Sequence, residues 1–196
     1  ISVLSVFIIM NVVAYFHANK FTHFDTSGKV KTKNAKQLSF PEKVKTLFLG
    51  INNPRPKNNT IPKIPFETIK LKSNKEIECW LIKADSAKGT VIIFHGYSGS
   101  KGSMLDKADE FLKMKYNTLL VDFMGSGGSE GDQCTIGFFE AEQVKTCFDY
   151  IQKQGETNIM LFGTSMGAAA IMKAQNDFKL PAKALILECP FGSMLK

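Results

Sequence analysis

The chain has 196 residues, of which 44% are apolar and 22% are charged, and this composition excludes a mostly disordered protein. The formal charge of +7 raises the question of nucleic-acid binding, but the charge is unevenly distributed. Residues 1–18 carry none, residues 19–75 carry 13 basic and 3 acidic side chains, and residues 76–196 carry 12 and 15. The part with a globular pattern is therefore slightly acidic, and we expect no nucleic-acid partner.

The four cysteines are far apart in the sequence and form no C-x-x-C pair; they are Cys79, Cys134, Cys147 and Cys189. This spacing indicates neither a zinc site nor a dense disulfide framework. We interpret them as buried thiols, which leave the redox compartment open. We expect no metal and no cofactor.

The first 18 residues, ISVLSVFIIMNVVAYFHA, form an uncharged apolar segment. As a helix they would be about 27 Å long, close to the roughly 30 Å of a hydrocarbon core. The favoured interpretation is a single-pass membrane anchor at 1–18. A cleaved signal peptide and a buried helix are the alternatives, but bulky Tyr15, Phe16 and His17 stand where a cleavage site needs small residues.

Residues 19–65 are rich in Lys, Asn, Thr and Pro and are expected to form a basic linker. One short helix is predicted at 41–50, because Val44, Leu47 and Phe48 share a face and Gly50 is a typical stop. Beside an anchor, such a linker would contact anionic lipid, at about 1 kcal/mol per basic residue near the surface; a solvated tether is the alternative. The lysine excess favours a cytoplasmic domain, but an upstream flank could reverse the orientation, so the side of the membrane stays open.

From residue 66 the pattern changes to short strands alternating with helices. Residues 66–71 and 76–82 flank a turn and predict an antiparallel hairpin. Apolar strands then alternate with amphipathic helices, in the order strand 90–96, helix 104–115, strand 117–123, helix 138–154, strand 158–163, helix 168–178 and strand 183–189. This alternation is typical of an α/β fold with a mostly parallel sheet covered by helices on both faces.

In such sheets the ligand site lies at the carboxyl ends of the strands. Residues 163–167, Gly-Thr-Ser-Met-Gly, form a G-x-S-x-G motif that follows a strand and enters a helix. A tight turn of this kind exposes the serine hydroxyl at the top of the sheet. Ser165 is therefore the candidate nucleophile, although a serine in an ordinary turn is the alternative. Residues 127–131 match the same pattern, but that match lies within a glycine-rich loop with no helix opening after it.

Two further loops follow strands of the sheet. An acyl-transfer site needs two backbone N–H groups for the developing oxyanion, and Tyr97, in the loop 94–100, and Met166 are the fitting donors. His95 precedes the nucleophile by 70 residues and is interpreted as part of a structural His-Gly turn rather than as the base. The loop 122–131 lacks the lysine of a P-loop and is interpreted as a structural turn, not a phosphate cradle.

The segments HGYSGS, DFMGSGGSEG, GTSMGA and LECPFGS, in this order, resemble the α/β-hydrolase superfamily. They look most similar to membrane-anchored serine hydrolases related to monoacylglycerol lipases and prolyl-oligopeptidase-like esterases. The resemblance covers residues 66–196 and implies Ser165 as nucleophile, Tyr97 and Met166 as oxyanion donors, and ester, thioester or amide substrates, lipid-like acyl compounds among them. Met124 departs from the arginine that the family commonly has in this loop.

The superfamily order is Ser, then Asp or Glu, then His, yet no histidine follows Ser165 in this sequence. Glu188, at the end of the last strand, is a weaker candidate for the acid. The sequence therefore predicts the N-terminal part of a hydrolase domain, interrupted after the strand ending near Cys189, whose acid and base lie beyond residue 196. A fragment of this kind is expected to be inactive alone.

The alternative is a non-catalytic, membrane-tethered binding module with a hydrolase-like fold. Neither the substrate nor the oligomeric state is indicated by the sequence.

Overall fold

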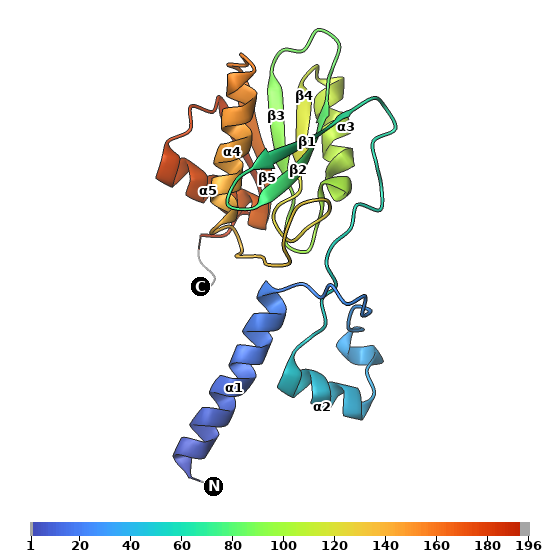
Figure 1. The fold of residues 1–196 in the computed structure, drawn as a ribbon, viewed down its shortest axis with the longest axis vertical. Coiled ribbons are helices and arrows are strands. Elements are labelled where there is room, and N and C mark those ends of the chain that lie inside the picture. The colour runs from blue at the N-terminus through green and yellow to red at the C-terminus, as the bar shows by residue number, and fades with distance from the viewer. Residues whose placement is uncertain (1, 193–196) are drawn as a thin grey trace. The chain divides into compact units, whose positions relative to one another are not determined.

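The computed structural model describes residues 2–192, and the chain forms two compact units, Ile1–Arg55 and Pro56–Lys196. The first unit contains the long helix α1 (Val3–Thr22), the short 3₁₀ helix η1 (Ala35–Gln37) and the helix α2 (Phe40–Leu49) (Figure 1). The second unit contains the remaining helices and all six strands of the sheet.

Helix α1 has no buried residue, although it is apolar along most of its length. Its 20 residues make it about 30 Å long. The amide of Asn11, near its middle, donates to the carbonyl oxygen of Phe7 at 2.8 Å, so this polar side chain is satisfied within the helix. By length and composition α1 could cross a membrane, a test that a signal sequence also passes.

Helix α2 corresponds closely to the helix predicted at 41–50. It begins with a capping box formed by Ser39 and Glu42, in which the backbone N–H of Ser39 donates to the Glu42 carboxylate at 2.8 Å. It ends at Gly50, whose φ is 77°. Helices α1 and α2 pack on each other, and the His17 Nε2–H donates to the carbonyl oxygen of Leu47 at 2.8 Å.

The sheet of the second unit has six strands in the order β1-β2-β4-β3-β5-β6. They are β1 (Glu67–Lys72), β2 (Glu76–Ile82), β3 (Thr90–Phe94), β4 (Asn117–Val121), β5 (Ile159–Thr164) and β6 (Ala184–Glu188). Strands β4, β3, β5 and β6 are parallel, whereas β2 is antiparallel to both β1 and β4. The predicted mostly parallel sheet with an antiparallel N-terminal hairpin is confirmed.

Helices cover both faces of this sheet because successive strand residues point to opposite sides. Helix α3 (Leu105–Lys113) packs on one face, where the Phe111 ring meets the Phe162 ring edge-on at 5.7 Å. Helices α4 (Glu140–Lys153) and α5 (Met166–Phe178) pack on each other and on the sheet, and Cys79 of β2 and Cys147 of α4 are both free and buried. Figure 1 shows α3 separated from α4 and α5 by the strands.

The second unit begins ten residues earlier than the hydrolase-like region expected from the sequence. Residues 56–65, which were expected to belong to the linker, are part of this unit. The carbonyl oxygen of Pro56 accepts from Gly127 N at 3.0 Å, and the Asn58 amide donates to Asp122 at 2.7 Å. These hydrogen bonds hold the segment against the loop after β4. The proline-rich composition of the segment did not predict them.

Candidate active site

Ser165 occupies the single residue between β5 and α5, with φ of 52° and ψ of −109°. A positive φ is unfavourable for a residue with a Cβ and persists only where the surroundings enforce it. Its N–H donates to the carbonyl oxygen of Glu188 at 2.8 Å, and its carbonyl accepts from Ala169 N at 3.0 Å. The tight strand-to-helix turn predicted for the G-x-S-x-G motif is therefore present.

The two glycines of the motif stand where backbone approaches backbone. A Cβ added at Gly163 would lie 2.6 Å from the carbonyl carbon of Gly167, and one added at Gly167 would lie 2.5 Å from the carbonyl oxygen of Phe94. Separations this short do not occur for real Cβ atoms. The glycines thus let α5 begin directly against β5 and the end of β3.

The loop after β3 lies beside this turn. A Cβ at Gly96 would be 3.6 Å from the Cβ of Ser165, so the residue preceding Tyr97 is adjacent to the candidate nucleophile. The loop is folded by a bond from Gly99 N to the carbonyl oxygen of Gly96 at 3.1 Å. Met166 is the first residue of α5, where an N–H has no carbonyl partner within the helix. The structure thus brings the three predicted site residues, Ser165, Tyr97 and Met166, to one end of the sheet.

The two serines that match G-x-S-x-G differ in their surroundings. Ser165 is partly exposed, and no hydrogen bond of its hydroxyl occurs among residues 2–192. The hydroxyl of Ser129 is buried, donates to the carbonyl oxygen of Asp122 at 2.7 Å and accepts from Glu78 N at 2.8 Å. Ser129 therefore fastens a loop, and only Ser165 presents a hydroxyl that could react.

His95 is fully buried. Its Nε2 accepts from the backbone N–H of Phe123 at 3.1 Å, which requires Nε2 to be unprotonated, and its Nδ1–H donates to the carbonyl oxygen of Gly96 at 2.8 Å. Burial lowers the pKa of this imidazole below its usual value. His95 is thus a neutral structural residue that joins the loops after β3 and β4, in agreement with its interpretation as a turn residue.

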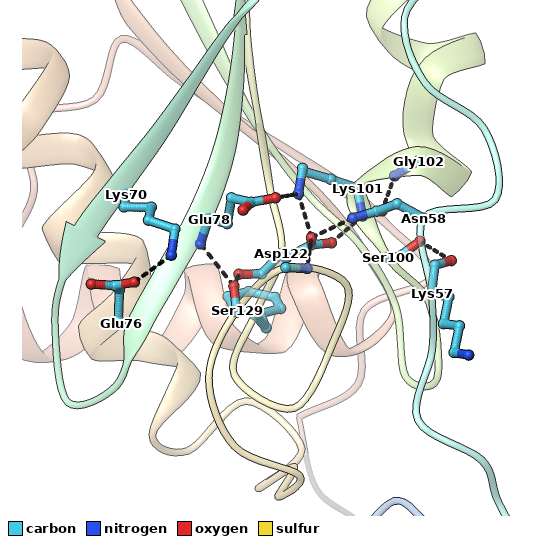
Figure 2. Close-up of polar contacts among 12 residues, drawn as sticks. Lys57, Asn58, Lys70, Glu76, Glu78, Ser100, Lys101, Gly102, Asp122 and Ser129 are labelled. Carbon is cyan, nitrogen blue, oxygen red and sulfur yellow. Dashed lines mark hydrogen bonds and ion pairs between the residues drawn. The ribbon is translucent and has the colours of Figure 1, made fainter. Parts of the chain in front are cut away.

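A buried ionic cluster lies next to these loops, as Figure 2 shows. Lys101 and Asp122 have no exposed side-chain surface, and the Lys101 ammonium bonds both Asp122 and, at 2.8 Å, Glu78. It also lies 4.4 Å from the centre of the Trp80 ring. The backbone N–H of Lys101 donates to Asp122 Oδ1 at 2.7 Å, so the start of the 3₁₀ helix η2 (Lys101–Met104) is bonded to the residue that follows β4.

The Asp122 carboxylate gathers donors from three parts of the chain. Besides Lys101, it accepts from Asn58 Nδ2 at 2.7 Å and from Gly128 N at 2.8 Å. Burial by itself would raise the pKa of this carboxyl, but the charge and hydrogen bonds of Lys101 outweigh burial and lower it. A Cβ at Gly127 would lie 1.9 Å from Asp122 Oδ2, which explains the glycines in this loop. The interpretation of 122–131 as a structural turn is consistent with these contacts.

Sequence reasoning missed this cluster. Lys101 reads as an ordinary surface residue because lysine is almost never fully buried, and Asn58 lies in a stretch without periodicity. Only the D-x-x-G-x-G spacing of the loop hinted that Asp122 has a structural partner.

Both carboxylate oxygens of Glu188, the weaker candidate for the acid, already have partners. Oε2 accepts from the Thr164 hydroxyl at 2.7 Å, and Oε1 pairs with the Lys107 ammonium at 3.1 Å. The Thr164 bond and then Lys107 lower its pKa, so the group is ionised at neutral pH. Its catalytic role stays a prediction.

Cys134 lies against the side chain of Met166, the first residue of α5. Its buried thiol is 3.2 Å from the sulfur of Met166, and burial raises its pKa to about 12. A protonated thiol at this depth packs as a small apolar group. Cys134 therefore supports the Met166 side chain.

Comparison with known proteins places this geometry in a family. Residues 85–195, more than half of the chain, match the family model described as serine aminopeptidase S33. A Mycoplasma genitalium protein named "Putative esterase/lipase 2" is 29% identical over 128 residues, which cover 62% of this chain and 46% of that protein. The Escherichia coli O157:H7 protein YfhR is 26% identical over 132 residues and 45% of its length. The chain thus spans about half the length of these relatives.

Solved structures show the same fold. The Pyrococcus furiosus esterase Pf2001 is similar with a TM-score of 0.64 and 25% identity, over 70% of this chain and 55% of that one. A hydrolase from Thermoplasma acidophilum described as CIB-like gives a TM-score of 0.52 at 23% identity, over 64% and 63%. The second unit therefore has the α/β-hydrolase fold.

Proposed function

The chain belongs to the S33 serine aminopeptidase family of α/β hydrolases, and we propose that it supplies the nucleophile and the oxyanion hole of a membrane-anchored serine hydrolase. Ser165 Oγ attacks the carbonyl carbon of an ester, thioester or amide. The backbone N–H groups of Tyr97 and Met166 stabilise the oxyanion that forms. The similarity to a protein named "Putative esterase/lipase 2" supports a substrate that is an ester or a lipid-like acyl compound.

The observation that carries this proposal is the backbone of Ser165. Positive φ at a non-glycine residue, enforced by two glycines that admit no Cβ, projects a hydroxyl without hydrogen-bond partners among the described residues. Such strain is typical of a functional turn. The Gly96 loop beside Ser165 and the first N–H of α5 support the proposed donors, because an oxyanion hole needs N–H groups close to the nucleophile.

We propose that the general base is a histidine outside these 196 residues, preceded by its acid. A serine hydroxyl is a poor nucleophile at neutral pH without a base. The only histidine of the second unit is His95, and its Nε2 is already used by Phe123 N. The relatives are about twice as long as the matched region, which is compatible with this expectation.

The proposal also includes membrane anchoring through α1. Its exposed apolar side chains, its length of about 30 Å and the self-satisfied Asn11 support a helix in a hydrocarbon core. The basic residues that follow it would lie at the surface of the bilayer.

A fluorophosphonate probe tests the nucleophile in the whole gene product. We expect labelling of the native protein and none of Ser165→Ala. Ser86→Ala, an exposed serine distant in sequence from the motif, is the matched control and should label like the native protein. Equal labelling of Ser165→Ala would refute Ser165, and failure of the native protein to label would favour a non-catalytic binding module.

A further inference from the structure

The first unit contains a pocket of about 480 Å³ surrounded by lysines. Its basic lining residues come from the end of α1, from the segment before η1 and from α2; they are Lys20, Lys29, Lys31, Lys33 and Lys45. Glu42 is the only acidic side chain among the lining residues, and its carboxylate already accepts from Ser39 N and Ser39 Oγ. The pocket therefore has a strong excess of positive charge.

Most of this charge is uncompensated. Lys29 pairs with Asp25 at 3.8 Å and Lys33 interacts electrostatically with Glu42, but within residues 2–192 none of Lys20, Lys31 and Lys45 forms an ion pair. Lysines that converge on one hollow without counter-charges repel each other, and an anion bound among them would relieve that repulsion. The charge of the pocket thus favours an anionic ligand.

Helix α2 separates this pocket from an apolar surface. Glu42, Lys45 and Thr46 line the pocket from one side of the helix. The opposite side carries exposed apolar residues with the spacing i, i+4, i+7, i+8, namely Phe40, Val44, Leu47 and Phe48. A short helix with one apolar and one polar face is typical of a segment lying in the plane of a membrane surface.

The position of α2 along α1 fits the depth of such a helix. Leu47 and Phe48 line an apolar groove of about 490 Å³ together with residues of α1 from Ile9 to His17. Val13, within that stretch, is seven residues before Lys20, which is about 10 Å along a helix axis. Interfacial helices lie about 5–10 Å into the boundary between headgroups and acyl chains. With Lys20 among the headgroups, α2 would lie at this depth.

We propose that the lysine pocket binds the phosphate headgroup of an anionic phospholipid, while α2 lies in the same leaflet and the groove between α1 and α2 takes an acyl chain. This inference rests on the proposed anchoring by α1. Without such a site, the basic residues would be attracted to anionic lipid only nonspecifically. The proposed site binds one lipid and thereby holds the first unit at the membrane surface.

Lipid titration of the full 196-residue chain in mild detergent tests the site. Native mass spectrometry counts the adducts of short-chain phosphatidylglycerol and of phosphatidylcholine with the same acyl chains. We expect phosphatidylglycerol to be retained about tenfold more tightly, the effect of one to two lysine contacts. The variant Lys31→Gln/Lys33→Gln/Lys45→Gln should lose this preference. The variant Lys63→Gln/Lys72→Gln/Lys75→Gln removes the same charge from exposed positions in the second unit and should keep it.

Three results would overturn the proposal: no headgroup preference in the native chain, a preference that survives in the pocket variant, or inorganic phosphate binding as tightly as phosphatidylglycerol. The last result would indicate a site for a free anion. Flotation with neutral phosphatidylcholine vesicles reports anchoring by α1 alone. A chain that floats but shows no headgroup preference would retain its anchor and lose the lipid site.

The depth of α2 is measured separately with an environment-sensitive fluorophore. The label is attached at Phe48→Cys or, on the opposite face, at Thr46→Cys, each in a Cys189→Ser background that removes the exposed native thiol. In vesicles, the label at 48 should be quenched at least about threefold more strongly than the label at 46 by nitroxides on the acyl chains, because the two positions differ in depth. Equal quenching would contradict an interfacial α2.

Discussion

His95 Nε2 accepts a hydrogen bond from the backbone N–H of Phe123 at 3.1 Å, and this bond joins the loops that follow the two neighbouring parallel strands β3 and β4. The rings of the two residues also meet edge-on at 5.2 Å. A proton on Nε2 would break the bond, so the fold requires the neutral imidazole.

This requirement predicts an effect of pH on stability. Burial depresses the folded-state pKa of His95 below the unfolded value of about 6.5. The unfolded state therefore binds the additional proton, and stability is fully present above about pH 6.5 and falls as the pH decreases below it, by at most about 1.4 kcal/mol per unit. Urea unfolding followed by the fluorescence of Trp80, the single tryptophan, would measure this. His95→Gln should be less stable, and its stability should vary less between pH 6.5 and 5; an unchanged slope would contradict the assignment.

Lys101 is predicted to be essential for the stability of the second unit. Lys101→Met leaves the buried Asp122 carboxylate without its cation, and removal of one partner from such a pair costs about 3–5 kcal/mol. Lys113→Met breaks the exposed pair with Glu110 and should cost under about 1 kcal/mol. Chemical denaturation of both variants provides the comparison. Similar costs for the two would show that the buried cluster contributes little.

The Asn58 side chain bonds the loops after both β3 and β4. Its Oδ1 accepts from Gly102 N at 3.0 Å, and its Nδ2 donates to the ionised Asp122. We expect Asn58→Ala to destabilise the second unit by about 2–3 kcal/mol, because one lost bond is to a charged group. Asn59→Ala, at the exposed neighbouring position, should have little effect.

Truncation tests the boundary of the unit independently. A chain beginning at residue 56 should melt at the same temperature as the full chain, whereas one beginning at residue 66 should melt several degrees lower. If both truncated chains melted at the same temperature, the second unit would begin after residue 65, as expected from the sequence.

The strands and helices of the second unit were predictable because each carries a strong local signal. The apolar run of β3 predicts a buried strand, and the amphipathic face of α4 predicts a helix with one buried side. The Ser165 turn was predictable because only glycine fits at positions 163 and 167. The Lys101 cluster was not, because it depends on long-range pairing between charged residues whose individual preference is for solvent. For the same reason the role of Asn58 could not be seen within a proline-rich segment.

The proposal that the general base lies outside these 196 residues predicts a difference in the rate of reaction. Hydrolysis of p-nitrophenyl acetate by the 196-residue chain should be at least about 100-fold slower than by the whole gene product, because a positioned general base typically contributes about 10²–10⁴-fold. Ser165→Ala should abolish the remaining activity of both proteins. Equal rates for the two would mean that the base lies within these residues.

The glycine at position 167 should be required for both the fold and the reactivity of the Ser165 turn. A methyl group there would meet the Phe94 carbonyl at 2.5 Å, so Gly167→Ala must displace either the start of α5 or the end of β3. Overpacking of this kind costs about 1–3 kcal/mol, and displacement of α5 would also move the N–H of Met166 away from the proposed position of the oxyanion. Gly192→Ala is the control, because position 192 has open space around it.

Fluorophosphonate labelling of the whole gene product measures the effect on reactivity. Labelling should be at least about tenfold slower for Gly167→Ala, since one oxyanion donor contributes about 10²–10³-fold to the rate. The comparison is made at a temperature where circular dichroism shows that the variant is folded. Labelling at the native rate would show that this close packing is not what positions the oxyanion hole.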